Sequence, residues 1–421
     1  MLDRFSFKVF FIASFITSLA GLRLSAAFAN VSQCLPQREV HRLHLADFES
    51  PAELVTPPAG QPVKALVILF AGSDVADMDS AIVDEKNRIV SRPLREIADA
   101  LSCAGYASFR YNKRWVTGAT TVDRAKFNQL SGVDLANDGR SALRFAANLQ
   151  AMRNVPTVLA GWSEGTTVAM AVAKTERKVR AAVLLAPVVE SPAKTVQRQY
   201  LRVGRPYLET YSKDGALDAD AIARASEGPG GVLAQIFVRM FKGFRPGERI
   251  NSLLDTDKNG KIEFSEADPI LASWYADIPN GGLGMSATGR ALPGVSEAFF
   301  AGAPPILILQ GLNDAMVEPT AATIFAAGVG SEKRVKIRTY SGLGHSLGVA
   351  PSIIEDQLLP VADQPLVDMM QWLDQTVTRD LRKRSMLPTT DASPAKIGAG
   401  ARPDAARVGS QRQPASSARG E

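Results

Sequence analysis

The chain has 421 residues, of which 46% are hydrophobic and 22% are charged, and its formal net charge is +5. This composition is typical of a globular protein with a buried core, long enough for one large domain with an insertion or for two ordinary domains. The small positive charge forms no basic stripe with interleaved aromatic residues, so a nucleic-acid partner is not expected.

The N-terminus has the pattern of a secretory signal peptide. Two basic residues precede the apolar run VFFIASFITSLAGL at 9–22, and AFA at 27–29 offers a cleavage site between small residues. The alternative is an uncleaved anchor, but the run is shorter than the ~20 residues that cross a bilayer. We therefore expect export to the periplasm or the medium, with no membrane span after the signal is removed.

Two cysteines, Cys34 and Cys103, remain in the expected mature chain. An oxidising compartment would allow them to form a disulfide. They could equally be two buried thiols, and the sequence leaves both interpretations open.

Between the ends, short apolar strands alternate with helices. Buried strands are expected at 65–72, 106–112, 181–189, 304–311 and 333–340, helices at 91–105 and 135–152, and a strand, sharp turn and helix at 156–175. VHRLHL, which holds His41 and His44, alternates like a peripheral strand. Strands separated by helices imply parallel pairing, so the predicted fold class is α/β, with a mostly parallel, doubly wound sheet.

The turn at Ser163 carries the chemistry. Gly161 to Gly165 spell G-x-S-x-G between a strand and a helix, a tight turn that lifts the serine hydroxyl above the edge of the sheet. The backbone N–H of Glu164 then points toward an oxyanion formed on an acyl group.

A serine nucleophile needs a base, and the chain contains three histidines. His345 lies in the glycine-flanked loop SGLGHSLG after the last strand, which is where the base is expected from chain order. Asp314 follows the strand at 304–311 and is preferred over Glu318 as the carboxylate that orients the histidine. The predicted catalytic residues are therefore Ser163, Asp314 and His345.

Four stretches resemble the α/β-hydrolase superfamily. They are FAGSDVADMD at 70–79, SFRYNKR at 108–114, GWSEGT at 161–166 and GLGHS at 342–346. Within the superfamily the chain resembles bacterial exported esterases and the serine aminopeptidase-like branch, over roughly residues 40–187 and 304–376. The resemblance implies a serine hydrolase in which the N–H of Ser73 is the second oxyanion donor.

The chain departs from these relatives in two places. Ala71-Gly72 stands where relatives carry His-Gly at the start of the oxyanion loop. Trp115 stands where they carry glycine, and we expect it to narrow the pocket. Asp77 and Asp79 match an acidic pair of the relatives, and we interpret them first as turn and cap residues.

More than a hundred residues separate the strands at 181–189 and 304–311, so an inserted domain is expected there. In the superfamily such an insertion resembles a helical cap over the active site. The helix at 231–241 places Val232, Ile236, Phe237, Met240 and Phe241 on one side. We favour this side as the core of the cap over the alternative, a wall that binds the acyl group. We divide the chain into a signal peptide (1–29), core (30–187), cap (188–303), second core segment (304–384) and a disordered tail (385–421), whose Ser-, Pro-, Ala- and Gly-rich composition cannot bury enough surface to fold.

The stretch LLDTDKNGKIEFSEADP at 253–269 spaces oxygen donors as a calcium loop does and resembles an EF-hand. The predicted ligands are Asp255, Asp257, Asn259, the carbonyl of Lys261, Glu263 and Glu266, with Gly260 at the sharp turn. No second hand is expected, and Pro269 is expected to interrupt the outgoing helix. We expect a structural Ca²⁺ that clamps the cap, and no cofactor for the chemistry.

The predicted function is the hydrolysis of a small-molecule carboxylic ester through an acyl-enzyme. A serine peptidase acting on short peptides is the main alternative, and it would need an acidic group for the substrate amine, for which Glu190 and Glu209 are candidates. Acyl transfer stays open as well. A non-catalytic, calcium-dependent binding module is less favoured, because all three candidate catalytic residues are present.

Overall fold

The computed structural model describes residues 34–385 except positions 74, 85, 244, 246, 278–290 and 330–333. The expected signal peptide, and the expected tail from residue 386 on, lie outside the described residues. Among the helices that are described, none has the length and apolar character needed to span a membrane.

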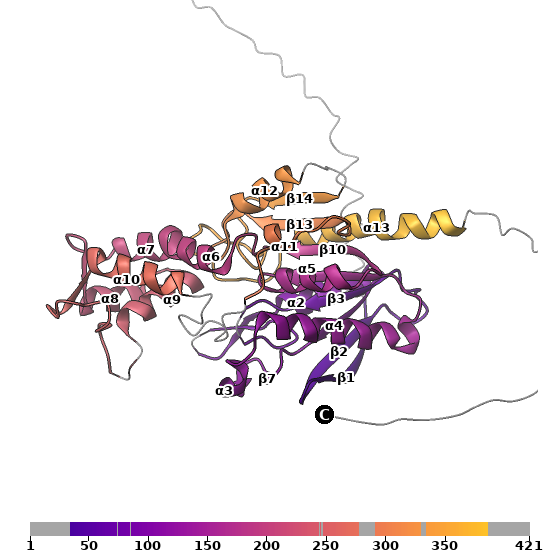
Figure 1. Ribbon diagram of the computed structural model, residues 1–421, viewed down its shortest axis with the longest axis horizontal. Coiled ribbons are helices and arrows are strands. Elements are labelled where there is room, and N and C mark those ends of the chain that lie inside the picture. Colours follow the sequence, from indigo (N-terminus) through magenta and orange to yellow (C-terminus); the bar gives the residue numbers. More distant parts are fainter. Residues whose placement is uncertain are drawn as a thin grey trace, which may run out of the picture.

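A sheet of eight strands forms the centre of the larger part of the molecule (Figure 1), in the order β1-β2-β6-β3-β9-β10-β13-β14. The strands are β1 (Gln37–Leu45), β2 (Phe48–Thr56), β3 (Leu66–Phe70), β6 (Ala107–Tyr111), β9 (Thr157–Trp162), β10 (Val179–Leu185), β13 (Ile306–Gly311) and β14 (Val335–Tyr340). All pairings from β6 to β14 are parallel, whereas β1 and β2 are antiparallel additions at one edge. The predicted fold class, a mostly parallel doubly wound sheet, is confirmed.

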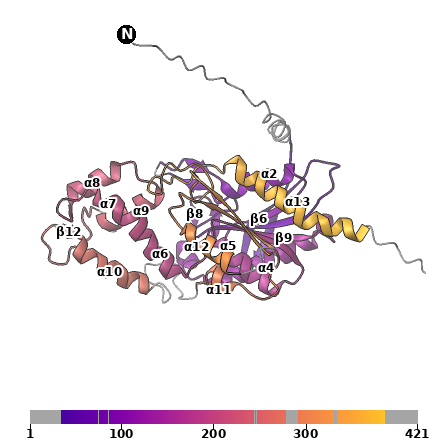
Figure 2. The same cartoon turned by 90° about the horizontal axis from the view of Figure 1, so that it is seen from above.

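Helices cover both faces of this sheet (Figure 2). One face is covered by α2 (Pro93–Cys103) and α13 (Asp363–Ser385), and the other by α4 (Gly132–Asn148), α5 (Gly165–Thr175), α11 (Val295–Ala298) and α12 (Pro319–Gly328). Neighbouring residues of a strand point to opposite faces, so Val67 and Leu69 of β3 pack toward α2 and α13, while Ile68 and Phe70 pack toward α4 and α5. This two-sided burial explains the continuous apolar run of β3.

Strand β2 was not expected from the sequence. Its sequence FESPAELVT contains Pro51, which removes a backbone donor and usually argues against a strand inside a sheet. The structure accommodates Pro51 because the pairing of β2 with β6 extends from Val55 only to Ala52.

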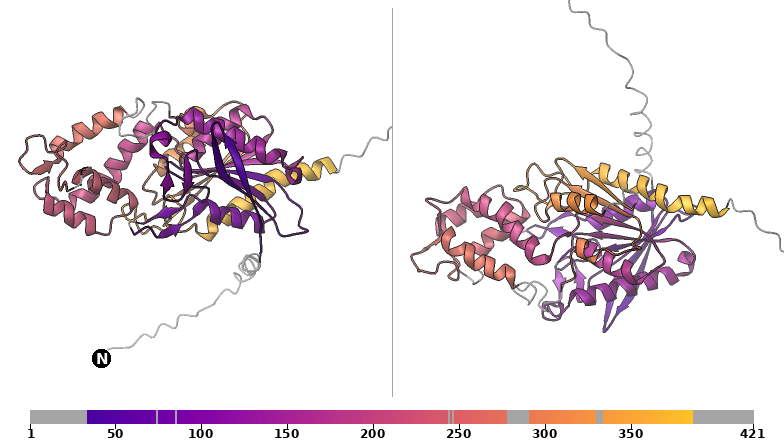
Figure 3. Two further views of the ribbon diagram at one scale, coloured as in Figure 1. Left: turned by 90° about the horizontal axis from the view of Figure 1, so that it is seen from below. Right: turned by 45° about the horizontal axis from the view of Figure 1, so that its top comes forward.

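Between β10 and β13 the chain forms a group of helices that extends from one end of the sheet (Figures 1 and 3). Its elements are α6 (Pro192–Gln199), the π-helical η3 (Tyr200–Gly204), α7 (Arg205–Glu209), β11 (Ala216–Asp218), α8 (Ala219–Glu227), α9 (Val232–Lys242), β12 (Lys261–Glu263) and α10 (Phe264–Ala276). We call this group the cap. It has a hydrophobic core of its own, which includes Tyr200, Leu217, Phe237 and Ile262.

The expected buried face of α9 is partly wrong. Phe237 and Phe241 are buried as expected, but Ile236 is exposed and Val232 is half-buried. The helix instead buries Leu233, Ala234 and Val238 together with the two phenylalanines. The helix is thus rotated relative to the expectation.

Pro269 also does not end the outgoing helix of the calcium-like loop. It lies inside α10, which continues to Ala276. A proline costs a helix one hydrogen bond, and burial of Leu271 and Tyr275 in the core of the cap offsets this cost.

Cys34 and Cys103 form a disulfide, with their Cα atoms 5.7 Å apart. Cys103 is the last residue of α2, and Cys34 lies just ahead of β1. The disulfide therefore fixes the beginning of the described chain to the helical layer beneath the sheet.

We expect the variant C34S/C103S to melt at a lower temperature than the wild type. The disulfide joins residues 69 positions apart, and removing a cross-link of this kind lowers the free energy of unfolding by about 2–5 kcal/mol. Thermal denaturation with and without a reductant measures the effect. The reductant should lower the melting temperature of the wild type and leave that of the variant unchanged. Equal melting temperatures of wild type and variant without reductant would contradict the prediction.

Candidate active site

Ser163 lies at the sharp turn between β9 and α5 and has a left-handed backbone, with φ of 55°. The glycines on either side are required by close backbone contacts. A Cβ atom on Gly161 would lie 2.2 Å from the carbonyl oxygen of Gly165, and a Cβ atom on Gly165 would lie 2.2 Å from that of Phe70. The G-x-S-x-G pattern is therefore a steric condition for this turn, which holds a strained serine above the sheet.

His345 and Asp314 come from two neighbouring strand ends and contact each other. The Nδ1 atom of His345 lies 3.0 Å from both carboxylate oxygens of Asp314. Both side chains are buried, with Asp314 at 0% and His345 at 3% exposure. Glu318, the competing carboxylate, instead forms an ion pair with Arg202 at 3.0 Å.

Asp314 is fixed by three donors besides the histidine. The backbone N–H groups of Met316 and Val317 donate to Oδ1 at 2.8 and 2.9 Å, and Nε2 of Gln310 donates to Oδ2 at 2.9 Å. Burial lowers the pKa of His345, but the charge and hydrogen bond of Asp314 outweigh it, so that the pKa is raised above its ordinary value. The imidazolium form is thus stabilised by the carboxylate behind it.

Ser163 and His345 line one cavity of about 370 Å³. Among the described residues, no hydrogen bond joins the hydroxyl of Ser163 to the imidazole of His345. Such contacts are often long before a substrate binds. Ser73 and Glu164, the two predicted oxyanion donors, line the same cavity beside Ser163.

The cavity lies between the end of the sheet and the cap helices α6 and α9. Most of its lining side chains are apolar: Val75, Ala76, Ala81, Ile82, Val83, Trp162, Val188, Pro192, Val196, Val232, Ala291, Leu292, Met316, Val317 and Leu358. Of the described residues that line it, Glu164 is the one carboxylate, and its Oε2 atom lies 2.8 Å from Nζ of Lys113. The surroundings of Ser163 suit an uncharged, apolar group.

The turn after β6 supports the loop that carries Ser73, a role that the sequence did not indicate. Arg114 forms an ion pair with buried Asp138 at 2.5 Å, and burial raises the pKa of Asp138 to about 6. The side chain of Asn112 accepts a hydrogen bond from the backbone of Met78 at 2.8 Å. The turn is thereby tied to the loop that carries Ser73.

The expected role of Trp115 is wrong. Its φ of 70° is left-handed, which is the backbone that favours glycine. Its ring packs against Phe48 at 5.1 Å and beneath Nζ of Lys126 at 4.4 Å, and it does not line the cavity described above. It therefore does not narrow the pocket.

Asp77 and Asp79, which follow β3, were expected to stabilise a turn and to cap a helix, and this is found for the turn. Asp77 Oδ1 accepts the backbone N–H of Ala81 at 2.9 Å and so stabilises a turn. Asp79 forms an ion pair with the buried Arg110 at 3.1 Å, a contact that the sequence analysis did not anticipate. Neither aspartate lines the cavity.

Asp356 is a further buried carboxylate beside the site, and sequence reasoning did not find it. Its Oδ2 atom accepts the backbone N–H of His345 at 2.8 Å. Burial and the neighbouring charge of Asp314 raise its pKa. Its sequence surroundings, SIIEDQLL, carry no motif that would have indicated this position.

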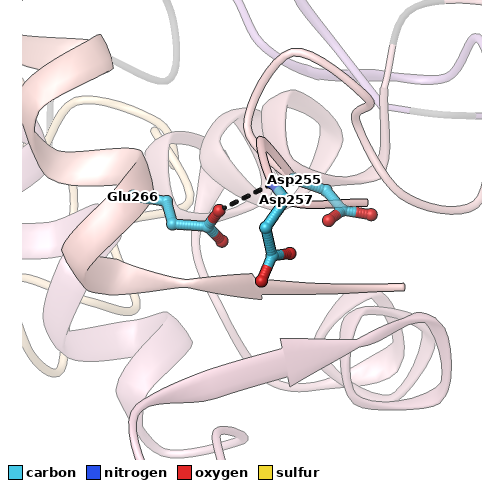
Figure 4. Close-up of side chains that lie close together, drawn as sticks. All are labelled: Asp255, Asp257 and Glu266. Atoms are coloured by element: carbon cyan, nitrogen blue, oxygen red, sulfur yellow. Dashed lines mark hydrogen bonds between the residues drawn. The ribbon is translucent and has the colours of Figure 1, made fainter. Parts of the chain in front are cut away.

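The calcium-like loop brings three carboxylates together. Oxygen atoms of Asp255, Asp257 and Glu266 all lie within 4.8 Å of one another (Figure 4). Glu266 faces the loop from the first turn of α10, and the hydroxyl of Thr256 is the main cause that lowers its pKa to about 2. Three ionised oxygens at this spacing fit around one calcium ion, whose oxygen ligands lie 2.3–2.6 Å away.

The remaining predicted ligands lie along the same loop. Gly260 has the left-handed φ of 84° that the sharp turn requires. The Nδ2 group of Asn259 donates to Asp257 at 3.0 Å and to Glu263 at 3.1 Å, and its Oδ1 atom accepts the N–H of Lys261 at 2.8 Å. Oε2 of Glu263 is buried and has no hydrogen-bond partner. Lys261, whose carbonyl is the remaining predicted ligand, begins β12.

The structure gives the loop a partner, contrary to the expectation that it stands alone. Strand β12 pairs with β11 in antiparallel register, with Leu217 opposite the buried Ile262. Counted from Leu217, the segment 210–221 has Asp214-Gly215 and Asp218 where the calcium-like loop has Asn259-Gly260 and Glu263. It has Thr210, Ser212 and Ala221 in place of Asp255, Asp257 and Glu266. The partner therefore repeats the glycine turn and the paired strand but lacks carboxylates at the positions of Asp255, Asp257 and Glu266. The D-G-x-L spacing was the signal that could have revealed it.

Comparison with known proteins finds one family model, described as serine aminopeptidase, S33, which matches residues 90–349. No curated protein sequence matches the chain. Solved structures that match the chain include Est1E from Butyrivibrio proteoclasticus with bound ferulic acid, at 14% identity and a TM-score of 0.44, covering 81% of this chain and 99% of that one. A monoglyceride lipase from Saccharomyces cerevisiae has 16% identity and a TM-score of 0.44, over 80% and 96% of the two chains. An esterase from Pyrococcus furiosus has 10% identity and a TM-score of 0.44, over 83% and 93%.

The family match extends over more than half of the chain, and it includes the turn at Ser163, the carboxylate Asp314 and the loop of His345. The sheet order and the helical layers on both of its faces are those of the α/β-hydrolase fold. The chain belongs to the serine aminopeptidase (S33) family of α/β-hydrolases.

Proposed function

We propose that the protein is a serine hydrolase that cleaves a carboxylic ester through an acyl-enzyme. The observation that carries the proposal is the buried contact of His345 with Asp314, 3.0 Å long, on the wall of the apolar cavity that also exposes Ser163. A nucleophile, a base and an orienting carboxylate are thereby present at one end of the sheet.

In this mechanism the Nε2 atom of His345 accepts the proton of the Ser163 hydroxyl as the oxygen attacks the acyl carbonyl. Asp314 holds the Nδ1–H group and stabilises the imidazolium. The N–H groups of Ser73 and Glu164 donate to the oxyanion of the tetrahedral intermediate. His345 then protonates the leaving alcohol, and a water molecule, activated by the same histidine, releases the acid.

The cavity favours an ester over a peptide with a free amino terminus. Recognition of an ammonium group needs an unpaired acid near the nucleophile, but Glu164 is paired with Lys113. The other candidate acids do not line the cavity: Glu190 pairs with Lys194 at 2.5 Å, and Glu209 pairs with Arg205 at 3.0 Å. The apolar walls support a substrate with an uncharged acyl group.

We further propose that the cap holds one structural Ca²⁺. Asp255, Asp257, Asn259, Glu263 and Glu266 would bind it with side-chain oxygens, and Lys261 with its carbonyl. The bound ion would supply charge neutralisation to the loop and no chemistry at Ser163. The ion would instead stabilise the sheet of β11 and β12 and the helices that it joins.

Export to an oxidising compartment is part of the proposal. The signal-like N-terminus predicts it, and the disulfide between Cys34 and Cys103 supports it, because such bonds persist mainly outside the cytosol.

We expect S163A to lose hydrolysis of a short chromogenic acyl ester by about 10⁴-fold or more, because no other group replaces the nucleophile. Initial rates of the purified proteins measure this. S226A, which changes an exposed serine on α8, is the matched control and should keep the wild-type rate. If the wild type cleaves peptides instead of the ester, the peptidase alternative is favoured, and turnover of neither would favour a binding module.

The kcat/KM of the wild type should rise with pH as His345 loses its proton. Because Asp314 raises the pKa of His345, the midpoint on the acidic side should lie above pH ~6.5, the ordinary value for histidine. A pH–rate profile with a substrate that does not ionise measures this midpoint. A midpoint below pH ~6 would contradict the assignment of His345 as a base stabilised by Asp314.

Removal of calcium should lower the melting temperature, and E266Q should abolish the response to added calcium, because the ligand that closes the loop is lost. Thermal denaturation with calcium or with a chelator measures the shift, and titration calorimetry should find one ion per chain. D220N is the control: Asp220 lies in the first turn of α8, within the partner segment, with 77% of its side chain exposed. If the melting temperature of the wild type were the same with calcium and with a chelator, the proposal of a calcium site would be wrong.

A further inference from the structure

The carboxylate of Asp356 joins the two loops that carry the base and its partner. Its Oδ2 atom accepts the N–H of His345 at 2.8 Å and that of Ala315, the residue after Asp314, at 3.2 Å. Its Oδ1 atom accepts the N–H of Leu358 at 3.2 Å. Asp356 is 1% exposed, so one buried side chain fixes the backbone on both sides of the contact between His345 and Asp314.

The histidine loop is shaped around this carboxylate. A Cβ atom on Gly344 would lie 2.3 Å from Oδ1 of Asp356, which is closer than nonbonded atoms approach. The glycine before His345 is therefore explained by the presence of Asp356. The backbone of the loop and the aspartate form one packed unit.

The same residue contacts the cap through its main chain. The carbonyl oxygen of Asp356 accepts the N–H of Val232, the first residue of α9, at 3.0 Å. The carbonyl of Ile354 accepts the N–H of Gly231 at 2.7 Å, and a Cβ atom on Gly231 would lie 2.4 Å from the carbonyl oxygen of Asp356. The first turn of α9 thus rests directly on the segment whose side chain holds His345.

The charged surroundings of Asp356 indicate that it does more than support the fold. Among the described residues no lysine or arginine forms an ion pair with it, and it faces Asp314 and His345. Arg202 of the cap donates to the carbonyl of Asp314 at 3.4 Å and pairs with Glu318. Burying a carboxylate beside another carboxylate is costly in free energy. The three amides that donate to Asp356 offset part of this cost, and the positive charge that develops on His345 would offset more.

We propose that Asp356 is a positioning residue of the hydrolase: its side chain sets the relative position of His345 and Asp314, and its main chain makes that position depend on the docking of α9. This inference rests on the proposed serine mechanism. As His345 becomes positively charged during the attack by Ser163, the charge of Asp356 stabilises it together with that of Asp314, and neither carboxylate takes a proton.

The test compares D356N, D356A and E355Q in the full mature protein, with initial rates on the chromogenic ester between pH 5 and 9. Asparagine keeps an oxygen to accept the N–H groups of His345 and Ala315, but it removes the charge and the acceptor for the N–H of Leu358. Glu355 is adjacent and half-buried, so E355Q changes a neighbouring carboxylate outside the machinery and should behave as the wild type.

We expect D356N to move the acidic midpoint of kcat/KM to lower pH by roughly half a unit or more, because one of the two charges that favour the imidazolium is lost. The value of kcat should fall and KM should change little, since Asp356 does not line the cavity. D356A also loses the hydrogen bonds, and the resulting misplacement should lower kcat by about 10²-fold.

A second pair of variants tests the hydrogen bond between Val232 and the carbonyl of Asp356 without substituting Asp356 itself. V232P removes the N–H that binds Asp356, at a first helical position where proline is tolerated and after an extended Gly231. V232A shortens the same side chain but keeps the N–H. We expect kcat of V232P to fall several-fold below that of V232A, with both proteins folded.

The outcomes separate this inference from the proposed function. If D356N kept the wild-type kcat and pH midpoint, with or without a lower melting temperature, Asp356 would only stabilise the fold, and the proposal would be wrong. Equal kcat values for V232P and V232A would overturn the connection to the cap. A wild type that shows no turnover dependent on Ser163 would instead contradict the proposed function itself.

Discussion

The site depends on the parallel arrangement of β9, β13 and β14, because parallel strands end at the same edge of a sheet. Ser163 follows the first of these strands, Asp314 the second and His345 the third, so their loops meet although the residues are far apart in sequence. The sheet alone does not bring the groups to bonding distance. That step needs the close backbone packing at Gly161 and Gly165 and the network of amides around Asp314 and Asp356.

The cap contributes to this network and is more than a cover. Side chains of α6 and η3 bind the loop after Asp314: Gln199 donates to the carbonyl of Met316 at 2.8 Å and Arg202 to that of Val317 at 3.2 Å. The first turn of α9 binds the segment of Asp356 from another direction. A change in the cap can therefore reach the histidine through main-chain hydrogen bonds.

Features with a short-range cause could be predicted from the sequence. The strained serine turn needs only its two glycines, and a buried parallel strand such as β3 is visible as a continuous apolar run. Asp314 and His345 could be chosen because each follows a strand end. The choice of Asp314 over Glu318 agrees with the geometry, since Glu318 is held by Arg202.

What the sequence did not reveal depends on tertiary contacts. Asp356 has no motif, because its contacts with the backbone of Ala315 and His345 join separate parts of the chain. Trp115 adopts a left-handed backbone through packing on Phe48, and Ile236 is exposed because α9 is rotated relative to its apolar stripe. The partner segment at 210–221 was not predicted because it has Thr210, Ser212 and Ala221 at the first, third and twelfth positions, where such loops carry carboxylates.

The ion pair of Lys113 with Glu164 has a consequence for how this site can vary. A free carboxylate on the residue after the nucleophile would oppose the negative charge that develops on the substrate oxygen a few ångströms away. Lys113, anchored at the end of β6, cancels that charge. Replacing Lys113 alone would leave the charge of Glu164 uncompensated beside Ser163, and replacing Glu164 alone would leave a buried cation without this carboxylate. The two positions are therefore coupled through their charges, although 51 residues separate them along the chain.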